Sequence, residues 1–179
     1  MDDDWFDIEV SETSEQQRVF IGVLQDFARS WPECPPDHTL VLAYRPGLDD
    51  EEDEHEPVEP VRDDIFASGE DVVRAVVDVS DLKNKLVLRT LCATMVGDRL
   101  VCSQVHDSTP AREFSKDVES LEATGSPQEL GRIAAAWFEE ILRRPVIAPQ
   151  RIREPKSFAS PGSPLPPGYV WIRNAPHPD

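Results

Sequence analysis

The stretch LVLRTLCATMVGDRLVCSQVHD, residues 86–107, decides the fold. Apolar residues recur with a period of two through both halves, which is the pattern of a β-strand. Gly97 and Asp98 separate the halves, and glycine readily takes the positive φ of a tight hairpin turn. A two-residue turn makes paired residue numbers sum to 195, which places Cys92 and Cys102 on opposite faces of the sheet. The sequence therefore predicts an antiparallel hairpin in which these cysteines form no disulfide.

Two further segments show the period of a strand. Residues 39–45 and 71–79 are predicted strands, bounded by proline or charged residues. Connection through hairpins favours antiparallel neighbours, so the four strands are predicted to form one mostly antiparallel sheet. Residues 111–123 are compatible with a short additional helix.

A helix is predicted on each side of the strands. Within residues 14–31 one apolar stripe follows the helical period, and Thr13 or Ser14 with a glutamine three residues later forms a capping box. The stripe consists of Phe20, Val23, Leu24, Phe27 and Trp31. The second helix begins after Ser126, has Glu129 at its third position, and ends before Pro145. The order α-β-β-β-β-α predicts one α+β domain over residues 1–146, with both helices on one face of the sheet.

The charge is concentrated in one half of the chain. The formal net charge is −17; residues 1–70 contain 21 acids and 4 bases, whereas residues 71–179 contain 14 of each. So acidic a surface repels nucleic acid and anionic membranes, which argues against direct binding to either. Residues 49–56 hold no apolar side chain and cannot bury surface, so we expect an exposed, mobile acidic loop over residues 47–70.

The end of the sequence has a composition of its own. Nine prolines fall between Pro145 and Asp179, so no long helix or central strand fits there. Residues 169–172 are too apolar for a free end, and we predict that residues 147–179 form an extended arm in which this segment packs on the body or adds as an edge strand. The alternative is a flexible tail that presents a polyproline ligand at residues 164–167.

No catalytic motif or metal-ligand spacing is recognisable. Cys34 and His38 supply at most two ligands, and a zinc site needs four, or three and a water. The sequence contains no phosphate-binding loop, nucleophile elbow or dinucleotide fingerprint. We therefore expect no enzyme, no cofactor and no metal. The first residues lack the basic and apolar regions of a secretory signal, and the apolar runs are too short for a membrane span, which predicts a cytoplasmic protein.

Binding to a basic protein is the leading functional hypothesis. An acidic surface steers a basic partner and speeds its encounter. We expect an inhibitor of immunity or antitoxin type that blocks a toxin or nuclease-like partner. The candidate partner-binding residues are Asp49, Asp50, Glu51, Glu52, Asp53, Glu54, Glu56, Asp63, Asp64, Trp5 and Phe6. The two aromatic residues are candidate interface anchors, or else they fold back on the core as a short strand.

Two alternatives use other residues or another target. A DNA mimic would present the same carboxylates to a DNA-binding defence protein, although mimics spread their acids along several elements. A small enzyme or ligand-binding domain would have a cavity between sheet and helices, lined by Arg89, His106 and Trp137. Arg74 and Arg89, placed within apolar strands, favour that second alternative unless they lie on a solvated sheet face or pair with Asp78.

Overall fold

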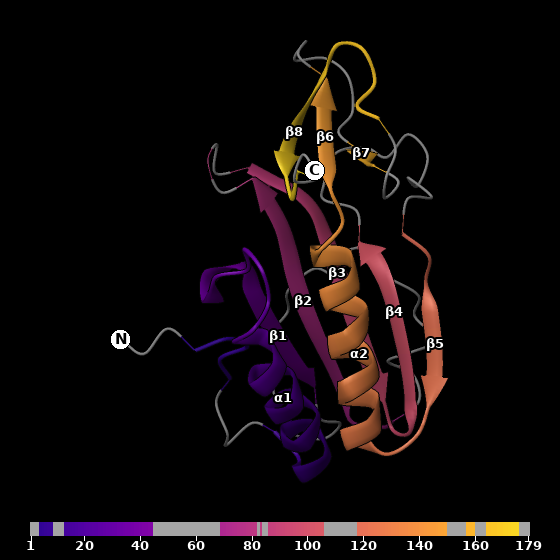
Figure 1. Ribbon diagram of the computed structural model, residues 1–179. Helices are drawn as coiled ribbons and strands as arrows, with labels where there is room; N and C mark the ends of the chain where they lie inside the picture. The colour runs from indigo at the N-terminus through magenta and orange to yellow at the C-terminus, as the bar shows by residue number, and fades with distance from the viewer. Residues whose placement is uncertain are drawn as a thin grey trace, which may run out of the picture.

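Five antiparallel strands form the main sheet, and two helices cover one of its faces (Figure 1). The computed structural model describes residues 4–8, 13–44, 69–81, 83, 86–105, 118–149, 157–159 and 164–175. Each strand pairs with the next along the chain, so the sheet is a meander. Its strands are β1 (Thr39–Tyr44), β2 (Val72–Asp81), β3 (Leu86–Val96), β4 (Arg99–Val105) and β5 (Leu121–Thr124). A 3-10 turn, η2 (Pro36–His38), precedes β1.

The hairpin β3–β4 has the predicted register. Cys92 pairs with Ser103 and Ala93 with Cys102, so paired numbers sum to 195. Gly97 has a φ of 56° at the turn. Cys102 belongs to the core beneath the helices, whereas Cys92 lies on the other face, and all three cysteines of the chain are buried and free.

The predicted sheet was one strand short. Residues 121–124 form β5, which pairs antiparallel with the beginning of β4, and the described part of the 111–123 segment contains no helix. Leu121 and Ala123 pack against the core, whereas Glu122 and Thr124 are exposed. The strand therefore alternates as a half-buried strand does, over only four residues.

Both helices begin with a capping box, as predicted. Helix α1 (Glu15–Ala28) is capped by Ser14, whose hydroxyl accepts from the backbone of Gln17. Helix α2 (Pro127–Leu142) is capped by Ser126 in the same way. No helix in the described part of the chain is long and apolar enough to span a bilayer.

The buried face of α1 is rotated about the helix axis relative to the predicted stripe. Phe20, Leu24 and Trp31 lie in the core as expected, but Phe27 is 39% exposed. Gln17, Ile21 and Ala28 complete the buried face instead. A polar residue, Gln17, thus begins the buried stripe in the first turn of the helix.

The tail forms a second sheet rather than the predicted extended arm. Strand β6 (Val146–Pro149) follows α2 and pairs with β7 (Ser157–Phe158) on one side and with β8 (Tyr169–Arg173) on the other. Residues 169–172 do form an edge strand, but its neighbour is β6 and not a strand of the main sheet. Figure 1 shows this small sheet beyond the end of α2. Pro145 ends the helix and leaves the chain free to enter a strand.

The two helices approach each other closely at a glycine. A Cβ atom at Gly131 of α2 would lie 2.9 Å from Cβ of Val23 and 3.1 Å from the carbonyl oxygen of Phe20, both in α1. Real Cβ atoms do not tolerate the first distance, and the second involves backbone that cannot rotate away. The absence of a side chain therefore sets the spacing of the helix pair.

We predict that Gly131→Ala lowers the free energy of unfolding by about 1–3 kcal/mol, because the added methyl group overpacks the helix contact. Gly22→Ala is the matched control in α1, since a Cβ there meets nothing within 4 Å. It should raise stability by about 0.5–1 kcal/mol through helix propensity alone. Urea denaturation of both variants distinguishes the two effects, and a stabilised Gly131→Ala would contradict the close approach.

Candidate functional site

One buried side chain, that of Gln17, binds the backbone at two places: where the chain leaves the sheet before the acidic run, and where it re-enters the sheet after it. Strand β1 ends at Tyr44 and β2 begins at Val72, so residues 49–56 lie between them. Nε2 of Gln17 donates to the carbonyl oxygens of Tyr44 at 3.0 Å and Val72 at 2.8 Å. Its Oε1 accepts from the backbone N–H of Ser14 at 2.8 Å. Both amide hydrogens and the amide oxygen are thus used, as a fully buried amide requires.

Further acids gather around this end of the sheet. Glu70 directly precedes the β2 entrance and lies against Gly97 in the β3–β4 turn. That turn is joined to the start of α2, because Gly125 donates to the carbonyl oxygen of Asp98 at 2.9 Å. The described acids here are Glu15, Glu70, Asp71, Asp98 and Glu129, and all but the half-buried Asp71 are exposed. We call this the acidic end; both helices begin there (Figure 1).

Described cations lie near these acids too: Arg18 donates to the carbonyl oxygen of Thr13 beside the start of α1, and, after the hydrogen bonds from Ser126, Arg132 contributes to the lowered pKa of Glu129. Nη2 of Arg99 lies 3.9 Å from Oε2 of Glu70, with both side chains largely exposed, so this contact is weak. Hydrogen bonds from Ser126 lower the pKa of the fully exposed Glu129 carboxyl and keep it charged. The helix dipole also stabilises carboxylates at helix N-termini, so their negative charge costs little stability here.

The predicted carboxylates of the acidic run are not among the residues that the structure describes. Asp49, Asp50, Glu51, Glu52, Asp53, Glu54, Glu56, Asp63 and Asp64 all lie outside the described ranges. What the structure adds is the position of the chain on either side of them, at Tyr44 and at residue 69.

Trp5 and Phe6 fold back on the body, in a turn and not in a strand. The Phe6 side chain is completely buried and meets Trp31 edge to face at 5.9 Å. Its N–H donates to Oγ1 of Thr39, which holds a backbone with a φ of 52°. Trp5 is half-buried and donates from Nε1 to the carbonyl oxygen of Cys34 at 2.8 Å. Phe6 thus presents no surface to a partner in this structure.

The two arginines of the enzyme alternative, Arg74 and Arg89, lie on opposite faces of the sheet. Arg74 donates to Thr94 on the helix-free face of the sheet, while Arg89 belongs to the opposite face and donates to the carbonyl oxygen of Leu88. Nε1 of Trp137 donates a hydrogen bond to the carbonyl oxygen of Glu119 at 3.2 Å. His106 lies outside the described ranges, and no described group of three His, Cys, Asp or Glu residues is placed to hold a metal ion.

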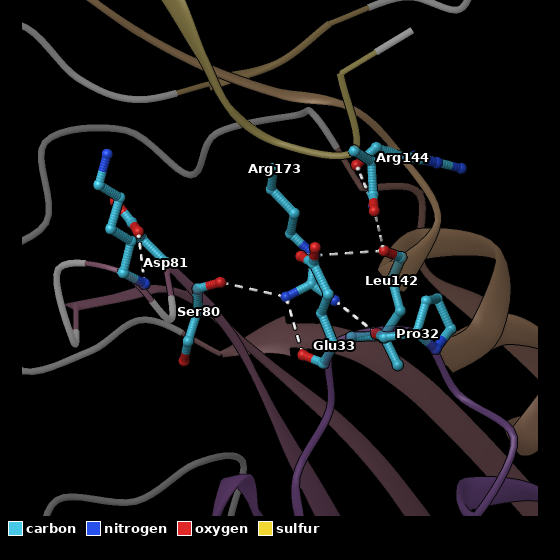
Figure 2. Close-up of polar contacts among 9 residues, drawn as sticks. Pro32, Glu33, Ser80, Asp81, Leu142, Arg144 and Arg173 are labelled. Atoms are coloured by element: carbon cyan, nitrogen blue, oxygen red, sulfur yellow. Dashed lines mark hydrogen bonds and ion pairs between the residues drawn. The ribbon is translucent and has the colours of Figure 1, made fainter. Parts of the chain in front are cut away.

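At the far end of the sheet a buried arginine joins the tail to the body (Figure 2). The guanidinium of Arg173, at the end of β8, donates to the carbonyl oxygens of Pro32, Glu33, Ser80 and Leu142 at 2.9–3.3 Å. The Glu33 carboxylate lies 3.7 Å from its Nε. Burial lowers the pKa of Arg173, and Glu33 opposes that shift. Sequence reasoning missed this residue, because its partners come from three distant segments.

Asn174 completes the junction. With a φ of 49°, it turns its side chain onto the end of α2, where Nδ2 donates to Leu142 at 2.6 Å and to Arg144 at 3.1 Å. The carbonyl oxygens of a last helical turn have no partner within the helix and need one from outside. Arg173 and Asn174 therefore have a structural role.

We predict that Arg173→Met lowers the free energy of unfolding by about 2–4 kcal/mol, because buried carbonyl oxygens lose a charged donor. Arg143→Met is the matched control: Arg143 is exposed and only pairs with Glu139 within α2, a contact whose loss costs under about 0.5 kcal/mol. Thermal and urea unfolding measure both. Equal effects of the two variants would remove Arg173 from its structural role.

The cysteines give stability a dependence on alkaline pH. Burial raises the thiol pKa of Cys34 and of Cys102 from 9.0 to about 12, and that of Cys92 in the same direction. The contribution of these protonated thiols to the free energy of unfolding is complete below pH 9. It is lost as the pH rises toward 12, because in that range the thiols ionise in the unfolded chain but stay protonated in the folded one. We predict a smaller loss of stability between pH 8 and about 10.5 in the Cys34→Ala/Cys102→Ala variant than in the parent. Parallel pH profiles of the two would contradict this.

Comparison with known proteins gives no family. No family model, no curated protein and no solved structure matches the chain. The arrangement of charge, buried amide and exposed strand is therefore the basis for any functional inference.

Proposed function

We propose that the protein is an acidic protein-binding module that neutralises a basic partner, as an immunity protein or antitoxin neutralises a toxin or nuclease. One observation carries this proposal: Gln17 holds the exit of β1 and the entrance of β2 at the end of the sheet where exposed acids gather. The acidic run of residues 49–56 is attached between these two points.

The physical basis of the proposal is electrostatic. Carboxylates attached to one end of a rigid sheet produce a field of one sign there, which orients a basic partner before contact. Such steering raises the association rate and depends strongly on salt. A toxin that acts on nucleic acid has a cationic cleft, and an acidic end of this kind complements it.

Two further elements belong to this proposal. We place the protein in the cytoplasm, which is supported by three cysteines that are buried and free. We also propose that it acts without catalysis; Arg74 and Arg89, the arginines that favoured a ligand site, lie on opposite faces of the sheet. A DNA-mimic role would use the same carboxylates and differ in the partner, so identification of the partner separates the two.

The test compares two sets of four neutralised acids. Glu51→Gln, Glu52→Gln, Asp53→Asn and Glu54→Gln alter the acidic run; Glu119→Gln, Glu139→Gln, Glu140→Gln and Asp26→Asn make the same change of charge elsewhere. Tagged parent protein first captures partners from the native host at low salt, and mass spectrometry identifies those that are lost at high salt. Association rates with the purified partner are then measured across a salt series.

We predict that the first set slows association about tenfold or more at low salt and flattens its salt dependence, because it removes the steering field. The second set should change the rate by less than about threefold. Equal slowing by both sets would show that only total charge matters, and the absence of any salt-sensitive basic partner would contradict the proposed function.

A further inference from the structure

Strand β1 is an edge strand of the described sheet, and its own six residues lack the usual protection, although Arg45 and Pro46 follow it in the sequence. It pairs with β2 along Thr39–Tyr44 in an unbroken register, and no described strand pairs with its other side. The sequence TLVLAY contains no charge, no proline and no glycine. Native edge strands generally carry a charge, a proline or a bulge that prevents another strand from adding.

The exposed face of β1 is apolar. Leu40 is 52% exposed and Leu42 53%, which makes them the most exposed large apolar side chains in the described part of the chain. Val41 between them is buried toward the helices. Both leucines therefore project from the helix-free face at the rim of the sheet, where a sixth strand would pack its own apolar side chains against them.

Charges of both signs flank this uncharged strand in the sequence: Arg45 follows Tyr44 directly, and acids precede Thr39, of which Glu33 lies 3.7 Å from Nε of Arg173. Exposed Glu33 and Asp37 precede it, Asp37 within η2. At its other end Tyr44 pairs with Val72, which follows Asp71 directly. An incoming strand thus meets an apolar centre on a protein whose formal net charge is −17.

The charge distribution decides which occupant fits. Acids outnumber bases in the chain by 35 to 18. Two copies of a chain with a net charge of −17 repel each other as wholes. A basic segment with apolar residues at alternate positions complements both the net charge of the protein and the exposed leucines of β1.

We propose that β1 accepts an extended segment of the basic partner as a sixth strand of the sheet. The inference rests on the proposed function and names the surface and the partner chemistry that it requires. The six residues of β1 span about 20 Å, which fits a partner strand of about six to eight residues. Main-chain hydrogen bonds supply affinity, and Leu40 and Leu42 select apolar residues at alternate positions.

The probe is a synthetic peptide of about eight residues in which leucine and threonine alternate between two terminal lysines. Two altered peptides accompany it: one is N-methylated at the amides that would pair with β1, and the other has glutamate in place of lysine. Binding to the full chain is measured by fluorescence anisotropy, and the site by backbone amide chemical shifts. The protein variants are Leu40→Thr/Leu42→Thr and Val87→Thr, the latter an apolar residue of β3 that is 48% exposed.

We expect the lysine peptide to bind with amide shifts centred on residues 39–44, and the N-methylated and glutamate peptides not to bind. Leu40→Thr/Leu42→Thr should weaken binding about tenfold or more through lost apolar contact, while Val87→Thr leaves it unchanged. Equal binding of the N-methylated peptide, or shifts away from β1, would overturn the inference. If the lysine peptide fails while salt-sensitive capture of a basic partner succeeds, the inference alone is wrong; if both fail, the proposed function falls as well.

Discussion

The guanidinium of Arg173 holds the second sheet against the first. It donates to backbone carbonyl oxygens in three segments that belong to different elements: the turn after α1, the end of β2 and the last turn of α2. A buried cation is costly unless its donors are used, and here four carbonyl oxygens accept from it with a carboxylate nearby. Because its partners are backbone atoms, the contact requires these segments to be in place at once. The position of the small sheet therefore depends on the completed fold of the main one.

The two ends of the main sheet serve different purposes. At the Arg173 end a buried cation is satisfied by backbone carbonyl oxygens. At the other end Gln17 performs the same task with a neutral amide, and the charged groups around it remain at the surface. Strand β1 connects the two ends along the rim of the sheet. A binding surface that combines the acidic end with this rim uses both long-range charge and short-range main-chain pairing.

Local patterns allowed much of the fold to be predicted. The Gly97-Asp98 turn determines the β3–β4 register, and the capping boxes at Ser14 and Ser126 mark where the helices begin. These features depend on residues within a few positions of one another. The predicted order of elements followed from them and is confirmed apart from β5.

The features that escaped prediction depend on distant contacts. Strand β5 has only four residues, too few for a period of two to be distinctive. The turned face of α1 follows from Gln17, whose amide is satisfied by carbonyl oxygens 27 and 55 residues away. Polar residues are ordinarily assigned to the solvent side, so such a burial is invisible without tertiary structure. The strand pairing of the tail likewise requires β6, and the many prolines of this region argued against a central strand there.

The Gln17 clamp separates the fold from the segment that carries the acids. Both attachment points are held by hydrogen bonds to α1, so the sheet does not need the intervening residues to define its register. Closing a flexible loop costs only about 0.6 kcal/mol more for each doubling of its length. The length and sequence between Tyr44 and Val72 can therefore change over evolutionary time with little effect on folding. The scaffold therefore tolerates variation of this one insertion without a change of its own sequence.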